Sequence, residues 1–298
     1  MPATPSTPVP QSNFASAILL GVFAVAAFGA TLPVTHIALE AFSPAFLTCA
    51  RALIATLIAV ITLRLFKRSL LGKNNTEVFI SGFLLIFAFP GLMAIAMQTV
   101  PAAHGGVVLG FLPLATAVIA RMIASETPST AFWIWSVMGG MIVTGFIFAR
   151  TGFSVSSTNV AGYGWLVLAG LSAACGYVIF GKLSRSTPGW VVISRALVIN
   201  TPVSIAGFYW VFGEVTVSPG IPQLAALFYL GSVSMFAAFC AWNAALAIGG
   251  IARIGQLQLL QIFFTIAVSA WLLGEKIDLL TIVAAIAVTL VIAASRRS

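Results

Sequence analysis

The sequence predicts an all-α integral membrane protein with ten transmembrane helices in two inverted five-helix repeats. Three observations support this fold class: the composition, a series of ten apolar segments, and a motif that occurs in both halves of the chain. Of the 298 residues, 60% are hydrophobic and 7% are charged, which leaves too few charges to cover a globular surface in water. The lipid bilayer is therefore the expected solvent.

The ten apolar segments are close to the length that a membrane crossing needs. A helix crosses about 30 Å of hydrocarbon with roughly 20 residues at about 1.5 Å each. In chain order the segments are residues 14–37, 44–63, 78–98, 103–120, 132–148, 162–180, 190–212, 224–243, 250–273 and 279–294. Lipid satisfies no backbone hydrogen bonds, and the segments lack the alternation of membrane-barrel strands, so each is expected to be a helix.

The residues around these segments agree with their boundaries. Residues 1–13 are polar and rich in proline, and we expect them to form a flexible tail. The connectors are mostly short, so consecutive helices should be antiparallel neighbours. All seven tryptophans fall within a few residues of a segment end, as anchoring at the membrane interface predicts. Three cysteines lie singly inside apolar segments, so we expect no metal site and no cofactor.

Basic residues are distributed unequally between the two sides of the predicted bundle. Ten crossings put both termini on one side, and nine basic residues lie there: Arg64, Lys67, Arg68, Lys73, Arg121, Lys182, Arg185, Arg296 and Arg297. The other side has Arg150 and Lys276. This asymmetry predicts a multi-pass protein of the cell inner membrane with cytoplasmic termini. We therefore interpret the net charge of +8 as an orientation signal and do not expect a nucleic-acid partner.

An internal repeat connects the two halves. Residues 44–53 and 188–197 share a proline, an aromatic residue, a small residue, an arginine, an alanine and a leucine at identical spacing, and residues 113–126 parallel residues 262–275, each ending in glutamate. The predicted repeats are residues 14–150 and 151–298. Because each holds five crossings, the second must be inserted upside down relative to the first. Such repeats place a substrate site near the midplane and expose it alternately to the two sides, which indicates transport.

These motifs also carry a family resemblance. The proline and arginine that open the second helix of each half, with Leu273, Gly274 and Glu275, resemble the drug/metabolite transporter superfamily and its ten-helix EamA-type branch over nearly the whole chain. Within that branch the chain is similar to bacterial aromatic amino acid exporters. The resemblance implies efflux of aromatic and other neutral amino acids. The partners expected are thus a small-molecule substrate and the bilayer, and the sequence does not indicate an oligomeric state.

Candidate site residues lie on three helices. Gln258, Gln261, Thr265 and Ser269 follow one another at steps of three and four in the ninth segment and form a polar stripe that lipid would not tolerate. Such a stripe serves either substrate binding or hydrogen bonding between helices. One face of the eighth segment and part of the third are also candidates for the wall of the substrate cavity, and ordinary helix packing explains them equally well. The residues are Tyr229, Ser232, Phe236, Phe239 and Asn243 in the eighth segment and Pro90 and Met93 in the third. Gln256 points away from the stripe and is expected to make an isolated packing contact.

Four cationic or titratable residues are candidates for gating or for structure. Arg51 and Arg195 lie seven residues inside their helices, where each either contacts a substrate carboxylate or gate, or caps the carbonyls of neighbouring helix ends. His36 and His104 lie near segment ends and either titrate during transport or serve as interfacial groups. Every acidic residue falls at a segment end or in a loop, so a carboxylate proton relay is not expected.

Other functions remain as alternatives to amino acid export. An exporter of other metabolites or of drugs, or a channel-like protein, would have the same composition. Pro33, Pro90, Pro113 and Pro202 interrupt helices, which favours a carrier over a fixed pore. An enzyme is not expected because the sequence contains no HExxH, no GxSxG and no phosphate-binding glycine loop.

Overall fold

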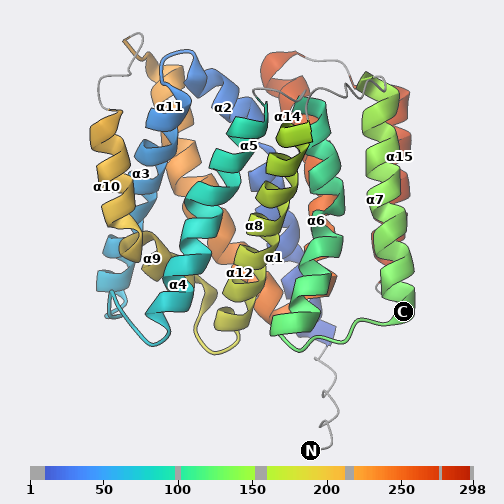
Figure 1. The fold of residues 1–298 in the computed structure, drawn as a ribbon, viewed down its shortest axis with the longest axis horizontal. Coiled ribbons are helices and arrows are strands. Elements are labelled where there is room, and N and C mark those ends of the chain that lie inside the picture. Colours follow the sequence, from blue (N-terminus) through green and yellow to red (C-terminus); the bar gives the residue numbers. More distant parts are fainter. Residues whose placement is uncertain (1–10, 98–101, 152–159, 212–217, 275–276, 296–298) are drawn as a thin grey trace, which may run out of the picture.

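The computed structural model describes residues 11–97, 102–151, 160–211, 218–274 and 277–295. They form a bundle of helices that run side by side, most of them along one common direction (Figure 1). The first five segments are α1 Gln11–Gly29 with α2 Thr31–Leu39; α3 Pro44–Leu65; α4 Asn75–Phe83, the π-helix η1 Leu84–Ala88 and α5 Phe89–Met97; α6 Ala102–Ile123; and α7 Thr130–Thr151.

The second five segments follow in the same way. They are α8 Val160–Ser184; α9 Gly189–Ile199 with α10 Thr201–Trp210; α11 Ile221–Tyr229, the π-helix η2 Leu230–Ala237 and α12 Ala238–Gly249; α13 Ile251–Gly255, the 3₁₀-helix η3 Gln256–Leu260 and α14 Gln261–Leu273; and α15 Leu279–Ser295. Each corresponds to one predicted segment. The predicted all-α membrane fold is confirmed.

Not all of the ten segments have the length and apolar composition of a complete membrane span. Within the described residues, seven helical spans are long and apolar enough to cross a membrane. An eighth is the pair α9 and α10, which is bent by 46°. The remaining two segments contain the shorter apolar helices Phe111–Ile123 and Leu279–Ser295. The chain is therefore a multi-pass membrane protein.

The third helical segment of each repeat contains a π-helical turn. In the first repeat η1 separates α4 from α5, and in the second η2 separates α11 from α12. A π-turn widens the helix and is frequent at functional positions. Its occurrence at equivalent places supports the repeat that the sequence motifs indicated.

The break between α1 and α2 has an identifiable cause in the sequence. Pro33 has no backbone N–H, so the carbonyl of Gly29, four residues earlier, loses its helical donor. The Thr265 hydroxyl of α14 donates to that carbonyl at 2.8 Å. A side chain at Gly29 would collide with Phe264, whose Cβ would lie 2.6 Å away. The proline break and the glycine together let α14 pack directly on α1.

Helices of the two repeats pack mainly on each other. α1 lies against α12 and α14, α5 and α6 lie against α8, and α7 lies against α15. In Figure 1, α1 and α12 lie close together behind α8. The largest hydrophobic cluster of buried residues combines side chains from both repeats. The core of the molecule is thus the interface between the repeats.

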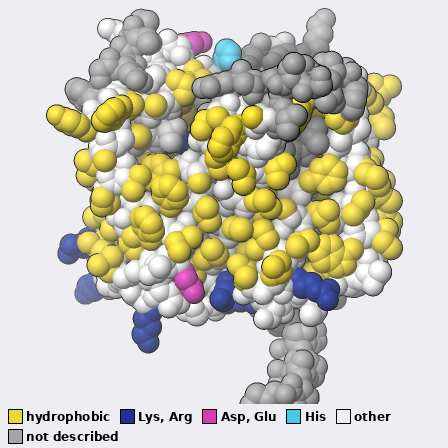
Figure 2. Space-filling view, viewed as in Figure 1, with side chains coloured by type: hydrophobic (Ala, Val, Ile, Leu, Met, Phe, Trp, Pro, Cys, Tyr) yellow, Lys and Arg dark blue, Asp and Glu magenta, His cyan; other side chains and the backbone are white. Residues whose placement is uncertain are grey.

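The two ends of the bundle differ in charge. α1 begins and α15 ends at the same end, which is the lower one in Figure 1. Lys and Arg side chains gather along this lower edge, below a broad hydrophobic surface (Figure 2). We call this end the basic face; it contains Arg64 in the last turn of α3 and the loop after α3 with Lys67, Arg68 and Lys73.

One sequence expectation about tryptophan is wrong. Trp242 is fully buried in α12, where its ring contacts Phe28 and Tyr177. It is a core residue and does not anchor the helix at the interface. Trp210 and Trp271 behave as expected, with 88% and 82% of their surfaces exposed near helix ends.

Candidate functional site

Five aromatic side chains meet where the two repeats are in contact. They are Phe28 of α1, Tyr177 and Phe180 of α8, and Phe239 and Trp242 of α12, and we call them the aromatic cluster. The Phe28 and Phe239 rings are 5.0 Å apart, and the Tyr177 and Trp242 rings are 5.8 Å apart, both in edge-to-face arrangements. Each ring is more than nine-tenths buried. The cluster is thus a buried aromatic contact to which both repeats contribute.

Gln258 lies beside this cluster, in η3. Its side chain is 3% exposed, and neither its amide nitrogen nor its carbonyl oxygen has a hydrogen-bond partner among the described residues. The Tyr177 hydroxyl lies next to it without meeting the geometry of a hydrogen bond. An unsatisfied buried polar group costs about 1–3 kcal/mol, so the fold holds Gln258 here at a cost in stability.

Two further polar atoms near the cluster are buried without partners in the described part of the chain. They are the indole Nε1 of Trp242 and the side-chain oxygen of Asn243. The Asn243 amide nitrogen donates to the Gly189 carbonyl at 3.4 Å, which ties α12 to α9. The site therefore combines aromatic faces with unpaired donors and acceptors and contains no charged side chain of its own.

The rest of the predicted polar stripe faces α1 or lies only partly buried. Thr265 donates to Gly29, as described above, and to the Gln261 carbonyl at 3.0 Å. Gln261 and Ser269 are half-buried. Gln256, expected to point away from the stripe and to make a packing contact, donates to the Ser136 hydroxyl of α7 at 2.7 Å. The 3₁₀ turn of η3 changes the rotation between successive side chains in this part of the helix.

The predicted face of the eighth segment is divided by η2. Phe239 belongs to the aromatic cluster, Asn243 lies one turn further on, and Phe236 is half-buried against the core. Tyr229 donates to the Ala27 carbonyl of α1 at 3.1 Å. The Ser232 hydroxyl is used within its own helix, where it donates to the Phe228 carbonyl at 2.6 Å.

The candidates on the third segment lie apart from the cluster. Pro90 is half-buried just after the π-turn η1. Met93 packs with Ala96, Leu166 and Tyr163 in a separate small cluster between α5 and α8. The structure does not bring them together with Gln258.

The two repeat-related arginines have different surroundings. Arg195 donates to the backbone carbonyl and the hydroxyl of Ser69, at 3.2 and 3.0 Å, and so holds the loop after α3 at the basic face. Arg51 is partly buried, and its Nε atom has no hydrogen-bond partner within the described ranges. His36 is exposed near the end of α2, and the side chain of His104 lies outside the described residues.

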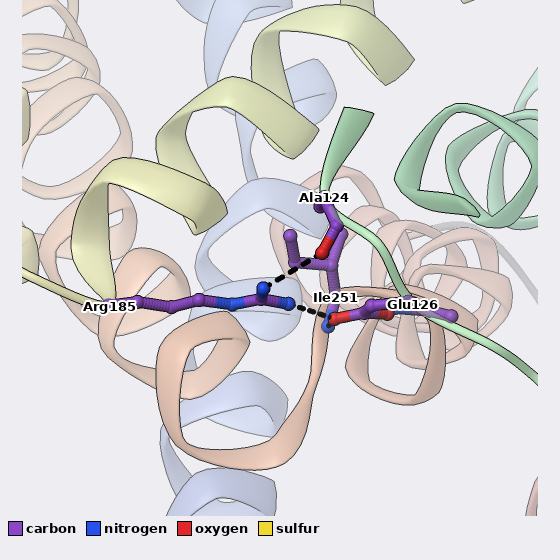
Figure 3. A network of polar contacts seen from close by, with 5 residues as sticks. Ala124, Glu126, Arg185 and Ile251 are labelled. Carbon is purple, nitrogen blue, oxygen red and sulfur yellow. Dashed lines mark hydrogen bonds and ion pairs between the residues drawn. The ribbon is translucent and has the colours of Figure 1, made fainter. Parts of the chain in front are cut away.

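A polar network at the basic face joins the repeats. Both carboxylate oxygens of Glu126, which follows α6, accept backbone N–H groups at the start of α13: Ile251 at 2.7 Å and Ala252 at 2.8 Å. Arg185, which follows α8, forms an ion pair with Glu126 at 2.6 Å and donates to the Ala124 carbonyl at 3.0 Å. Figure 3 shows the guanidinium between these two acceptors. We call these contacts the Glu126 network.

Sequence reasoning missed Phe28, Tyr177, Phe180 and Trp242 as site residues. Each lies in a segment whose residues are apolar on every side, so helical periodicity gave no preferred face. The signal that was available is Tyr177, a hydroxyl-bearing ring in the interior of an apolar segment, where it needs a polar neighbour.

Similarity to known proteins agrees with this architecture. The chain matches the EamA-like transporter family over residues 15–150 and 160–296. It is 37% identical over 278 residues to a Bacillus subtilis (strain 168) protein named "Uncharacterized transporter YdeK", covering 93% of this chain and 96% of that protein. A solved crystal structure has a TM-score of 0.81 and covers 95% of this chain and 98% of its own, at 20% identity, which shows the shared fold alone. Since the family match and this relative each extend over nearly the whole sequence, the chain belongs to the EamA-like transporter family.

Proposed function

We propose that this membrane transporter exports small amphipathic metabolites, with aromatic and other neutral amino acids as the leading substrates, by alternating access. The observation that carries the proposal is the Gln258 amide, which is buried beside the aromatic cluster with neither polar atom paired among the described residues. A side chain kept in this state at the repeat interface suits a ligand that completes its hydrogen bonds.

The chemistry of the site fits a neutral zwitterion. The Gln258 amide offers donors and an acceptor, which suit a carboxylate and an ammonium group. The rings of Phe28, Phe239 and Trp242 offer faces and edges to an apolar or aromatic side chain. The five rings and Gln258 carry no charge, which suits a substrate without a net charge.

We also propose that the basic face lies in the cytoplasm of a cell inner membrane. The concentration of Lys and Arg at that end supports it (Figure 2). In a cysteine-free variant, a cysteine that replaces Asn74, an exposed residue of the loop after α3, should react with a membrane-impermeant thiol reagent only after the cells are opened. Reaction in intact cells would show that the basic face lies outside the cytoplasm and would contradict the proposed orientation.

Resistance to a toxic substrate analogue tests the proposed direction. Cells that produce the protein should tolerate more 4-fluorophenylalanine than matched cells without it, because efflux lowers the internal concentration. The internal analogue is measured directly after a fixed exposure. Equal accumulation of the analogue in both strains would contradict amino acid export. If the protein then showed saturable efflux of organic cations or nucleotide-sugars, it would be an exporter of another metabolite or of drugs.

A further inference from the structure

A second cavity lies at the basic face, away from the aromatic cluster. It has a volume of about 500 Å³ and is formed by the loop after α3, the start of α4, the end of α8 and the first turns of α9. Arg68, Lys73 and Arg195 line it, together with the hydroxyl-bearing residues Ser186 and Thr187. No acidic residue belongs to its wall as described; Glu77, the nearest in the sequence, is exposed on α4. Three cations and two hydroxyls in one cavity fit a phosphate group.

The loop that carries two of these cations has the character of a membrane-interface segment. Leu65, Phe66 and Leu71 expose 74%, 66% and 56% of their surfaces, on either side of Arg68. The Phe66 ring also contacts Trp190 at the start of α9, with the ring centres 5.3 Å apart. Exposed apolar and basic residues in alternation are typical of chain that rests among lipid headgroups. The cavity thus lies at headgroup depth.

We propose that this cavity binds the headgroup of an anionic phospholipid of the leaflet at the basic face. The phosphate lies between Arg68, Lys73 and Arg195. Charge complementarity selects the headgroup, and the exposed apolar side chains of Leu65, Phe66 and Leu71 favour a lipid over a soluble phosphate. Bound there, the lipid contacts both repeats, because the loop after α3 belongs to the first and α9 to the second.

The test measures lipid affinity of the purified full-length protein. Phosphatidylglycerol is titrated into the protein in neutral detergent, with phosphatidylcholine as the uncharged comparison, and affinity is read from the shift in the unfolding temperature. Phosphatidylglycerol should bind more tightly, and Arg68→Gln with Lys73→Gln should weaken it about fivefold per charge removed, since each basic residue near the surface contributes about 1 kcal/mol. Circular dichroism without lipid verifies that the variants are folded.

Two matched variants locate the effect. Arg121→Gln removes an exposed arginine at the end of α6, outside the cavity, and should keep the wild-type affinity. Leu71→Gln removes an exposed apolar side chain of the same loop and no charge, and should weaken phosphatidylglycerol without affecting inorganic phosphate. Equal affinity for both lipids, or equal losses in Arg121→Gln and the double variant, would overturn the proposal. So would inorganic phosphate or glycerol phosphate stabilising the protein as well as the lipid does, since the site would then be one for a soluble anion.

Discussion

Replacing Gln258 by leucine is expected to lower kcat/KM for phenylalanine transport about tenfold or more, which corresponds to roughly 1.4 kcal/mol. The same replacement removes two buried polar atoms that have no described partners, so the folded protein should be as stable as the wild type or more stable. Transport and stability should therefore change in opposite directions, as expected where a binding residue is kept at a cost to the fold. Initial rates in proteoliposomes and unfolding temperatures in detergent measure both effects.

Gln256→Leu is the matched control, two residues away in the same 3₁₀ turn. Gln256 donates to Ser136, so its loss leaves a partner unpaired and should lower stability, while the transport kinetics of the surviving protein stay near wild type. If Gln258→Leu leaves the kinetics unchanged, or lowers stability as Gln256→Leu does, Gln258 is a packing residue and the aromatic cluster loses its polar contact to substrate.

Breaking the Glu126 network is expected to favour opening of the basic face. Glu126 caps the start of α13 from the end of α6, and these helices belong to different repeats, so the contacts cannot survive separation of the repeats at this end. Two hydrogen bonds to Glu126, whose side chain is 15% exposed, and its ion pair with the more exposed Arg185 stabilise the closed arrangement by about 2 kcal/mol. Glu126→Ala should therefore raise the population open at the basic face about 30-fold.

A buried reporter detects that shift. In a cysteine-free variant, Thr116→Cys places a thiol on α6 against Gly255 of α13, where the native side chain is 1% exposed. Its reaction with a maleimide should accelerate about 30-fold in Glu126→Ala, in proportion to the open population. Arg185→Gln, which keeps the two backbone contacts to Glu126, should produce a smaller acceleration. Equal labelling rates in all three proteins would show that the network does not hold this face closed.

Much of the fold could be predicted because each crossing is a long apolar segment. Pro33 and Pro202 indicated interruptions in the first and seventh segments, and the structure breaks there, at α1–α2 and α9–α10. The interruption expected at Pro113 is wrong, because α6 continues through it. The π-turns could not be predicted, since the residues of η1 and η2 differ little in character from their neighbours. Their geometry comes from tertiary packing, including Gly231, where an added Cβ would lie 2.7 Å from Ile54 of α3.

The candidate site was only partly predictable for a related reason. The polar stripe identified Gln258, because an amide inside an apolar segment is conspicuous. Which partners surround it depends on the rotation of η3 and on rings from α1, α8 and α12. In segments that are apolar on every side, the buried face of Phe28 or Trp242 is determined by neighbours distant in the sequence. Likewise, the sequence placed Arg51 and Arg195 at equivalent positions, but only the loop after α3 gives Arg195 its partner, Ser69.

Transport by the purified protein tests the central claim most directly, that a neutral amphipathic substrate crosses through the site between the repeats. Wild-type proteoliposomes are given labelled phenylalanine, tryptophan, leucine, a nucleotide-sugar and an organic cation, each with and without an imposed pH difference. We expect saturable flux of phenylalanine and tryptophan that needs no pH gradient, because each acidic residue within the described ranges lies at a helix end or in a loop. Saturable flux of the nucleotide-sugar or the cation with none of the amino acids would contradict the substrate assignment. Accumulation of phenylalanine against its gradient only when a pH difference is imposed would contradict uncoupled transport.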